Sequence, residues 1–88
     1  QFGMKRYRVD VTVLPKDGVL DIQGKAVERT LRQSGYASVD DVRVGRFIRF
    51  VVEADGEEAA GSVVDAVADD LLANGLIESY SYNMEPLP

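Results

Sequence analysis

A short segment of strict alternation constrains the fold of this chain more than any other feature. In RYRVDVTVL, residues 6–14, apolar side chains occupy every second position from 7 to 13, and charged or hydroxyl-bearing side chains occupy positions 6, 8, 10 and 12. The apolar positions are Tyr7, Val9, Val11 and Val13. A period of two gives a strand one apolar and one polar face, so the segment predicts a half-buried strand of a largely antiparallel sheet.

A turn and a helix are expected next. Pro15, Asp17 and Gly18 break the strand, because proline and glycine favour turns. Asp21 is a suitable N-cap for a helix whose apolar residues recur at helical spacing, and Gly35 is a suitable C-terminal stop.

The second extended segment is DVRVGRFIRFVVEA, residues 41–54. Its alternation does not reverse across Gly45, which favours one long strand bent at that glycine and spanning on the order of 40 Å. A hairpin at Gly45 and Arg46, giving two short strands, is the alternative. A long strand would extend past its neighbour and leave unpaired backbone edges for a partner subunit to cover.

The sequence DGEEAAG announces a second helix, because Asp55, Glu57 and Glu58 suit the positive end of a helix dipole. Asn74 and Gly75 are expected to end it. Its expected apolar stripe is Ala60, Val63, Val64, Val67, Leu71 and Leu72. A final strand, IESYSYNM, then places Tyr80, Tyr82 and Met84 on one face.

The predicted order is therefore β-α-β-α-β, with the middle strand long or split. We expect an α+β fold related to the ferredoxin-like arrangement, with two helices on one face of a small sheet. The 88 residues suffice for a single domain, 1–88. Met4 is a candidate natural start, which would make residues 1–3 an addition from expression.

Composition excludes several functions. A net charge of −5 argues against nucleic acid as the main ligand. The chain has no cysteine and no histidine, which removes the commonest nucleophile, general base and transition-metal ligands. We therefore expect no catalytic, cofactor or metal residues in this chain. No apolar run reaches the length of a membrane span, so we expect a cytoplasmic protein without a membrane partner.

The segment GVLDIQGKAVERTL, residues 18–31, superficially resembles a phosphate-binding loop. The spacing from Gly18 to Gly24 is one residue too long, and Ala26 stands where a Ser or Thr would hold magnesium. A capped helix start and a recognition loop remain as the two interpretations. The acidic pairs Asp40–Asp41, Glu57–Glu58 and Asp69–Asp70 are interpreted as solvated surface.

Four motifs in order support a family resemblance: GVLDIQGKAVERTL, VRVGRFI, EEA and LLANGLIESY. Together they resemble the PurS family, the small subunit of phosphoribosylformylglycinamidine synthase, over nearly the whole chain. Three positions depart from the family pattern. Ile22 and Gly75 replace prolines, and Arg46 replaces a frequent lysine.

The resemblance implies a non-catalytic adaptor in purine biosynthesis. It would bridge a glutaminase subunit and a large synthetase subunit that uses ATP and magnesium, and it would form a homodimer or tetramer. Whether the chain itself counts as an enzyme stays uncertain. On this resemblance we assign subunit contact to Asp21, Gln23, Gly24, Lys25, Glu28, Arg43, Gly45 and Arg46. The alternative is an ACT-like regulatory dimer that binds a small molecule, since such domains are also ferredoxin-like.

Overall fold

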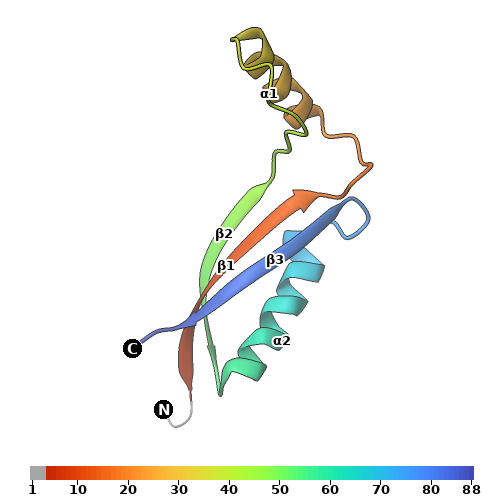
Figure 1. The fold of residues 1–88 in the computed structure, drawn as a ribbon. Coiled ribbons are helices and arrows are strands. Elements are labelled where there is room, and N and C mark those ends of the chain that lie inside the picture. Colours follow the sequence, from red (N-terminus) through yellow and green to blue (C-terminus); the bar gives the residue numbers. More distant parts are fainter. Residues whose placement is uncertain (1–3) are drawn as a thin grey trace.

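The computed structural model describes residues 4–88, so the expectation for residues 1–3 lies outside the described range. The elements are β1 (Lys5–Pro15), α1 (Ile22–Gln33), β2 (Arg46–Ala54), α2 (Glu57–Val67), the π-helical turn η1 (Ala68–Leu72) and β3 (Glu78–Pro86). The strands form an antiparallel sheet in the order β2-β1-β3 (Figure 1). The predicted β-α-β-α-β order and α+β class are confirmed.

The alternating first segment becomes the central strand of the sheet. Val9, Val11 and Val13 are completely buried, and Val64 of α2 completes the cluster with them. Val9 pairs with Phe50 of β2 on one side and with a methionine of β3 on the other. Burial of the predicted apolar face against one helix is the main source of hydrophobic stabilisation in the chain.

Helix α2 begins as the sequence predicts, with two glutamates in its first turn. Its completely buried residues are Ala60 and Val64, and Ala68 of η1 continues the same spacing of four positions. Part of the expected stripe is wrong, because Val63 is 42% exposed and Leu71 is 79% exposed. Val63 lies in regular α2 beside the completely buried Val64, whereas Leu71 lies in η1, where the helix widens from position 68 onward.

Among residues 4–88, α2 and its continuation η1 lie against the sheet and α1 does not, which corrects the expectation that both helices cover one face. Helix α1 extends beyond the end of the sheet, held there by its two connecting segments (Figure 1). Gly24 is the one buried residue within α1. The polar surface of this helix explains the difference, because Lys25, Arg29 and Arg32 leave it no broad apolar face for its own sheet.

The middle strand also needs a correction. Within residues 41–54, all of them described, β2 starts only at Arg46, and neither one long strand nor a hairpin forms. Gly45 lies so close to the carbonyl oxygen of Val13 that a side chain could not fit between them. Asp41 adopts a positive φ of 52°, which breaks the extended path. Residues 41–45 are therefore an irregular connector, and the expected overhang of β2 does not occur there.

Candidate subunit-contact site

Asp21 joins the start of α1 to the connector that precedes β2. One carboxylate oxygen, Oδ1, accepts the N–H of Gly24 at 2.9 Å, which is the predicted N-cap. The other, Oδ2, accepts the N–H of Val44 at 2.9 Å. These backbone donors, Gly24 first, lower the pKa of Asp21. A single side chain therefore fixes both the helix end and the neighbouring segment.

Two further residues of α1 hold the same connector. Glu28, one turn along the helix, accepts the N–H of Val42 at 3.3 Å. Gly24 lies between Asp21 and Glu28 and is buried. It packs so closely that an added Cβ would lie against the Asp21 carboxylate and 2.5 Å from the carbonyl oxygen of Val42. We call these contacts of Asp21, Gly24 and Glu28 with residues 42–44 the α1 clamp.

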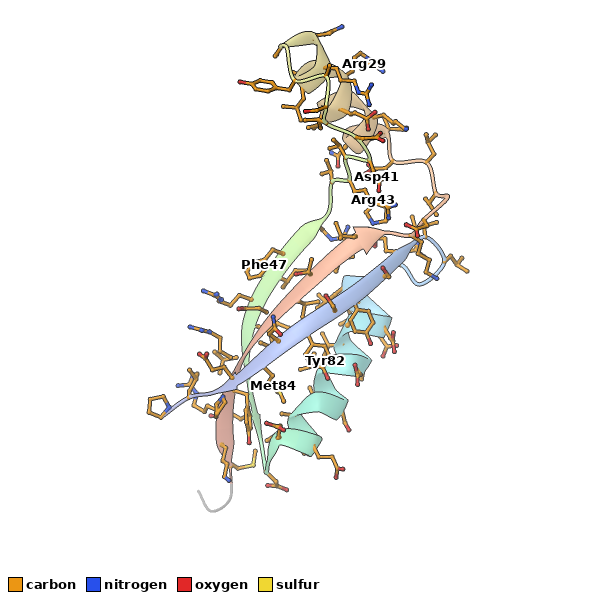
Figure 2. The ribbon with its side chains drawn as sticks, in the orientation of Figure 1. Arg29, Asp41, Arg43, Phe47, Tyr82 and Met84 are labelled. Carbon is orange, nitrogen blue, oxygen red and sulfur yellow. The ribbon has the colours of Figure 1, made fainter. Side chains whose placement is uncertain are left out.

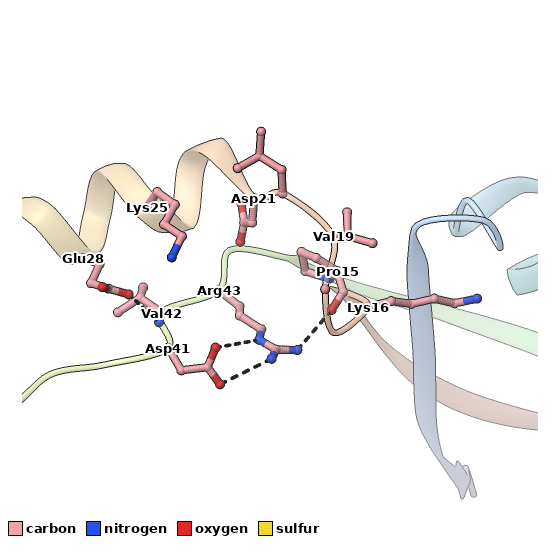
Figure 3. A pocket seen from close by; sticks show the side chains of 11 residues that line it. Pro15, Lys16, Val19, Asp21, Lys25, Glu28, Asp41, Val42 and Arg43 are labelled. Carbon is pink, nitrogen blue, oxygen red and sulfur yellow. Dashed lines mark hydrogen bonds and ion pairs between the residues drawn. The ribbon is translucent and has the colours of Figure 1, made fainter.

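Arg43 secures the other side of the connector. Its guanidinium contacts Asp17 at 2.5 Å. It also contacts Asp41 at 3.3 Å and donates to the carbonyl oxygen of Pro15 at 3.4 Å (Figure 3). These carboxylates, Asp17 first, raise the pKa of Arg43. The Lys25 side chain extends along the same hollow without an ion pair in the described part of the chain (Figure 3).

The hollow in Figure 3 has a volume of about 390 Å³ and lies between α1, the connector and the loop after β1. Three acidic and three basic side chains line it: Asp21, Glu28, Asp41, Lys16, Lys25 and Arg43. Arg43 is already neutralised, so the balance of charge does not suit a phosphate group. Among residues 4–88, the acidic side chains nowhere gather into a group that could hold a metal ion. The hollow is therefore better suited to protein contact than to a small anion.

The remaining assigned residues lie on an adjoining hollow of about 270 Å³, which shares the loop after β1. Gln23 and Gly45 line it. Arg46 donates to both carboxylate oxygens of Glu78 at 2.9 Å and to the carbonyl oxygen of Leu72 at 2.6 Å. The bonds between the two side chains lower the pKa of Glu78 and raise the pKa of Arg46. Arg46 thus ties β2 to the start of β3 and to the end of η1.

The structure consequently divides the eight assigned residues into two groups around one loop. Sequence reasoning missed Asp17, Asp41 and Glu78, the carboxylates that hold Arg43 and Arg46. Sequence proximity could have suggested Asp41, which lies two positions from Arg43, but not Asp17, which precedes Arg43 by 26 positions. The partner of Arg46 is 32 positions away, and only the register of the sheet brings the two together.

One finding bears on the membrane. Across residues 4–88, the helices are too short or too polar to cross a bilayer.

Comparison with known proteins gives a consistent result. A family model described as PurS, phosphoribosylformylglycinamidine (FGAM) synthase, matches residues 8–86. The chain is similar to the PurS subunit of Synechocystis sp., with 41% identity over 91% of this chain and 78% of the relative. It is similar to the Bacillus subtilis PurS subunit at 38% identity, over 90% of this chain and 93% of the relative.

Solved structures agree. B. subtilis PurS superposes with a TM-score of 0.79 at 39% identity, covering 90% of this chain and 98% of that chain. A chain in the structure of PurLQS from Thermotoga maritima gives a TM-score of 0.81 at 29% identity, covering 93% of this chain and 98% of that one. The matches decide between the two families considered from the sequence.

Proposed function

The chain belongs to the PurS family of phosphoribosylformylglycinamidine synthase subunits, and on that premise we propose that it is the adaptor of this complex. As a subunit of this synthase it takes part in purine biosynthesis. In the proposal, it bridges an ATP- and magnesium-dependent synthetase subunit and a glutaminase subunit in the cytoplasm. Ammonia from glutamine then converts formylglycinamide ribonucleotide to formylglycinamidine ribonucleotide on the partners, while this chain associates with a second copy as a dimer or tetramer.

The observation that carries the proposal is the similarity to a chain of the PurLQS structure over 93% of this sequence. The chemistry of the chain is compatible with it. The side chains of the α1 clamp accept backbone N–H groups, and Arg43 and Arg46 are committed to carboxylates. Such groups fix the position of a surface, whereas a catalytic group must remain available to its substrate.

We expect the clamp to present α1 as a rigid contact element. Lys25 is exposed beside the hollow, and rim charges of this kind chiefly set partner choice and association rate. Lys25→Glu should therefore weaken assembly with the two partner subunits without unfolding the chain.

The test is size-exclusion chromatography with light scattering on the three purified subunits. Arg6→Glu is the matched control, because Arg6 is an exposed cation at the far end of β1, outside the candidate site. The proposal expects reduced ternary complex with Lys25→Glu and an unchanged amount with Arg6→Glu. Wild-type amounts of complex with both variants would remove Lys25 from the contact, and failure of the wild-type chain to join either partner would refute the adaptor role.

A further inference from the structure

The turn that leads from η1 into β3 contains an asparagine followed by a glycine, Asn74 and Gly75 (Figure 1). Asparagine is chemically labile in such a pair. The backbone nitrogen of the glycine can attack the side-chain carbon of the asparagine and displace ammonia, which closes a cyclic imide. The attack needs an accessible side chain and a following residue without a Cβ to hinder it. Asn74, Gly75 and Leu76 are all exposed, so the turn meets both conditions.

The turn also polarises the side-chain carbonyl group that is attacked. Oδ1 of Asn74 accepts the N–H of Leu76 at 3.1 Å. This bond turns the side chain toward the peptide units that follow, where the attacking nitrogen lies. Oδ1 becomes negative when the nitrogen adds to Cγ, and a backbone N–H aimed at such an oxygen stabilises the developing charge.

The attacking nitrogen must lose its proton, and the turn favours that loss. The nitrogen of Gly75 and the carbonyl oxygen of Asn74 belong to one peptide group, so the oxygen shares the negative charge of the deprotonated group. That oxygen accepts the N–H of Ile77 at 3.0 Å and the N–H of Glu78 at 2.7 Å. Hydrogen bonds to the charged form favour it, so both donors make the Gly75 nitrogen easier to deprotonate.

The second asparagine of the chain provides a natural comparison. Asn83 is also exposed, but it lies within β3, opposite Asp10 of the central strand, where the sheet holds the backbone extended. The residue after it is Met84, whose side chain extends toward α2 and packs on the core (Figure 2). The Cβ of Met84 and the fixed strand both oppose ring closure. The two asparagines therefore share exposure and differ in the features that the reaction needs.

We infer that Asn74 is a site of spontaneous deamidation through a cyclic imide formed with Gly75. In the first step a bond forms from the Gly75 nitrogen to Cγ of Asn74 and the bond from Cγ to the side-chain nitrogen breaks. The proton lost by Gly75 leaves with that nitrogen as ammonia. In the second step water adds to either ring carbonyl and the bond from that carbonyl to the ring nitrogen breaks. The nitrogen recovers a proton, a carboxylate and a proton are released, and nothing is oxidised or reduced.

The modification affects a junction of the sheet. Glu78, at the start of β3, accepts the N–H of Asn74 at 2.9 Å and pairs with Arg46. Water opens the ring to an aspartate or to an isoaspartate, and either product adds a negative charge beside Glu78. The isoaspartate also lengthens the main chain by a carbon atom and displaces the oxygen that accepts the N–H groups of Ile77 and Glu78. We expect the isoaspartyl chain to hold Arg46 less firmly and to unfold at a lower temperature.

The test follows both asparagines in one sample of the full-length chain. The chain is incubated at mildly alkaline pH in water enriched in heavy oxygen, which enters the product when the ring is hydrolysed. Peptide mapping by mass spectrometry gives the labelled fraction at Asn74 and at Asn83, and electron-transfer fragmentation distinguishes isoaspartate from aspartate. Gly75→Ala is the matched variant, because a methyl group fits the open space there but hinders the attack. A parallel sample is unfolded in urea.

The inference expects Asn74 to deamidate at least about tenfold faster than Asn83, and Gly75→Ala to slow the reaction on the order of tenfold. It also expects the folded chain to react at least as fast at Asn74 as the unfolded chain, because the turn supplies the N–H donors. Equal rates at the two asparagines would overturn it. A folded chain that reacts much more slowly than the unfolded chain would overturn it as well, since the turn would then protect Asn74.

Thermal unfolding tests the effect on the junction. Asn74→Asp carries the added charge without the change in the main chain, so it is the control for the isoaspartyl chain separated by ion exchange. The isoaspartyl chain should have a lower Tm than both Asn74→Asp and the wild-type chain, and a wild-type Tm would contradict the effect on Arg46. Every measurement uses the isolated chain, so the outcome does not depend on the adaptor role.

Discussion

Two helical glycines in this chain should respond to the same substitution with opposite signs. Gly24 lies in the first turns of α1 and Gly61 lies in the middle of α2. Alanine is favoured over glycine in a helix by about 1 kcal/mol, so propensity alone predicts the same gain at both positions. The space around the added methyl group decides the sign.

At Gly61 the new Cβ would lie 3.4 Å from the Tyr82 hydroxyl, an ordinary contact, so the gain should be realised. At Gly24 it would collide with the Asp21 carboxylate and come within 2.5 Å of the Val42 carbonyl oxygen. Overpacking of this kind costs about 1–3 kcal/mol, which outweighs the propensity gain and forces the α1 clamp to open.

Thermal unfolding followed by circular dichroism, at equal chain concentration, measures both effects. One kcal/mol corresponds to about 4–8 °C in Tm for a domain of this size. We expect Gly61→Ala to raise Tm by up to that amount and Gly24→Ala to lower it by a similar amount. An equal rise in both variants would refute the assignment of Gly24 to a closed contact with the connector.

Three further predictions concern single groups. Arg46 lowers the pKa of Glu78, so this ion pair stabilises the fold above pH 4.5, the ordinary glutamate pKa, and the stabilisation is lost as the pH falls below that value. Glu78→Gln should therefore have a lower Tm than the wild-type chain at pH 7, and this difference should shrink below pH 4.5. A difference in Tm that does not change with pH would contradict the prediction. Burial, helped by a nearby aspartate, raises the pKa of Tyr80 to about 12. The protonated hydroxyl therefore contributes its full stabilisation below the ordinary tyrosine pKa of 10, and this stabilisation is lost as the pH rises through 12. An ultraviolet titration of Tyr80→Phe should lack the ionisation step near pH 12, and retention of that step would assign it to another tyrosine. Gly45→Ala should lower Tm because its Cβ would meet the backbone of β1, whereas Gly75→Ala, which has open space, should leave Tm nearly unchanged; equal Tm values would show that β1 moves aside at no cost.

The sequence predicts well those parts of the fold that local patterns determine. The alternation around Val11 identifies the central strand and its buried face, and the start of α2 follows from its acidic first turn. Asp21 was correctly predicted as a cap because capping depends on residues only three positions apart. Tyr82 likewise lies on the predicted face of β3, toward α2.

Features that depend on contacts distant in sequence could not be predicted. A helical pattern does not show the body against which α1 packs, and Ile22 at its start is 74% exposed, so the position of α1 beyond the sheet was missed. The alternation before Arg46 looked like a strand because parity does not show where backbone N–H groups find partners. The N–H groups of Val42 and Val44 are bound by the side chains of Glu28 in α1 and of its N-cap Asp21, which no periodic pattern records.

The adaptor account is tested most directly by reconstituting the reaction. Formation of formylglycinamidine ribonucleotide is measured with the matching synthetase and glutaminase subunits, with glutamine or with free ammonia, in the presence and absence of this chain. The account predicts that ammonia supports the reaction without the chain, whereas glutamine supports it only when the chain is added. Equal glutamine-dependent rates with and without the chain, from partner subunits whose separate activities are intact, would contradict it.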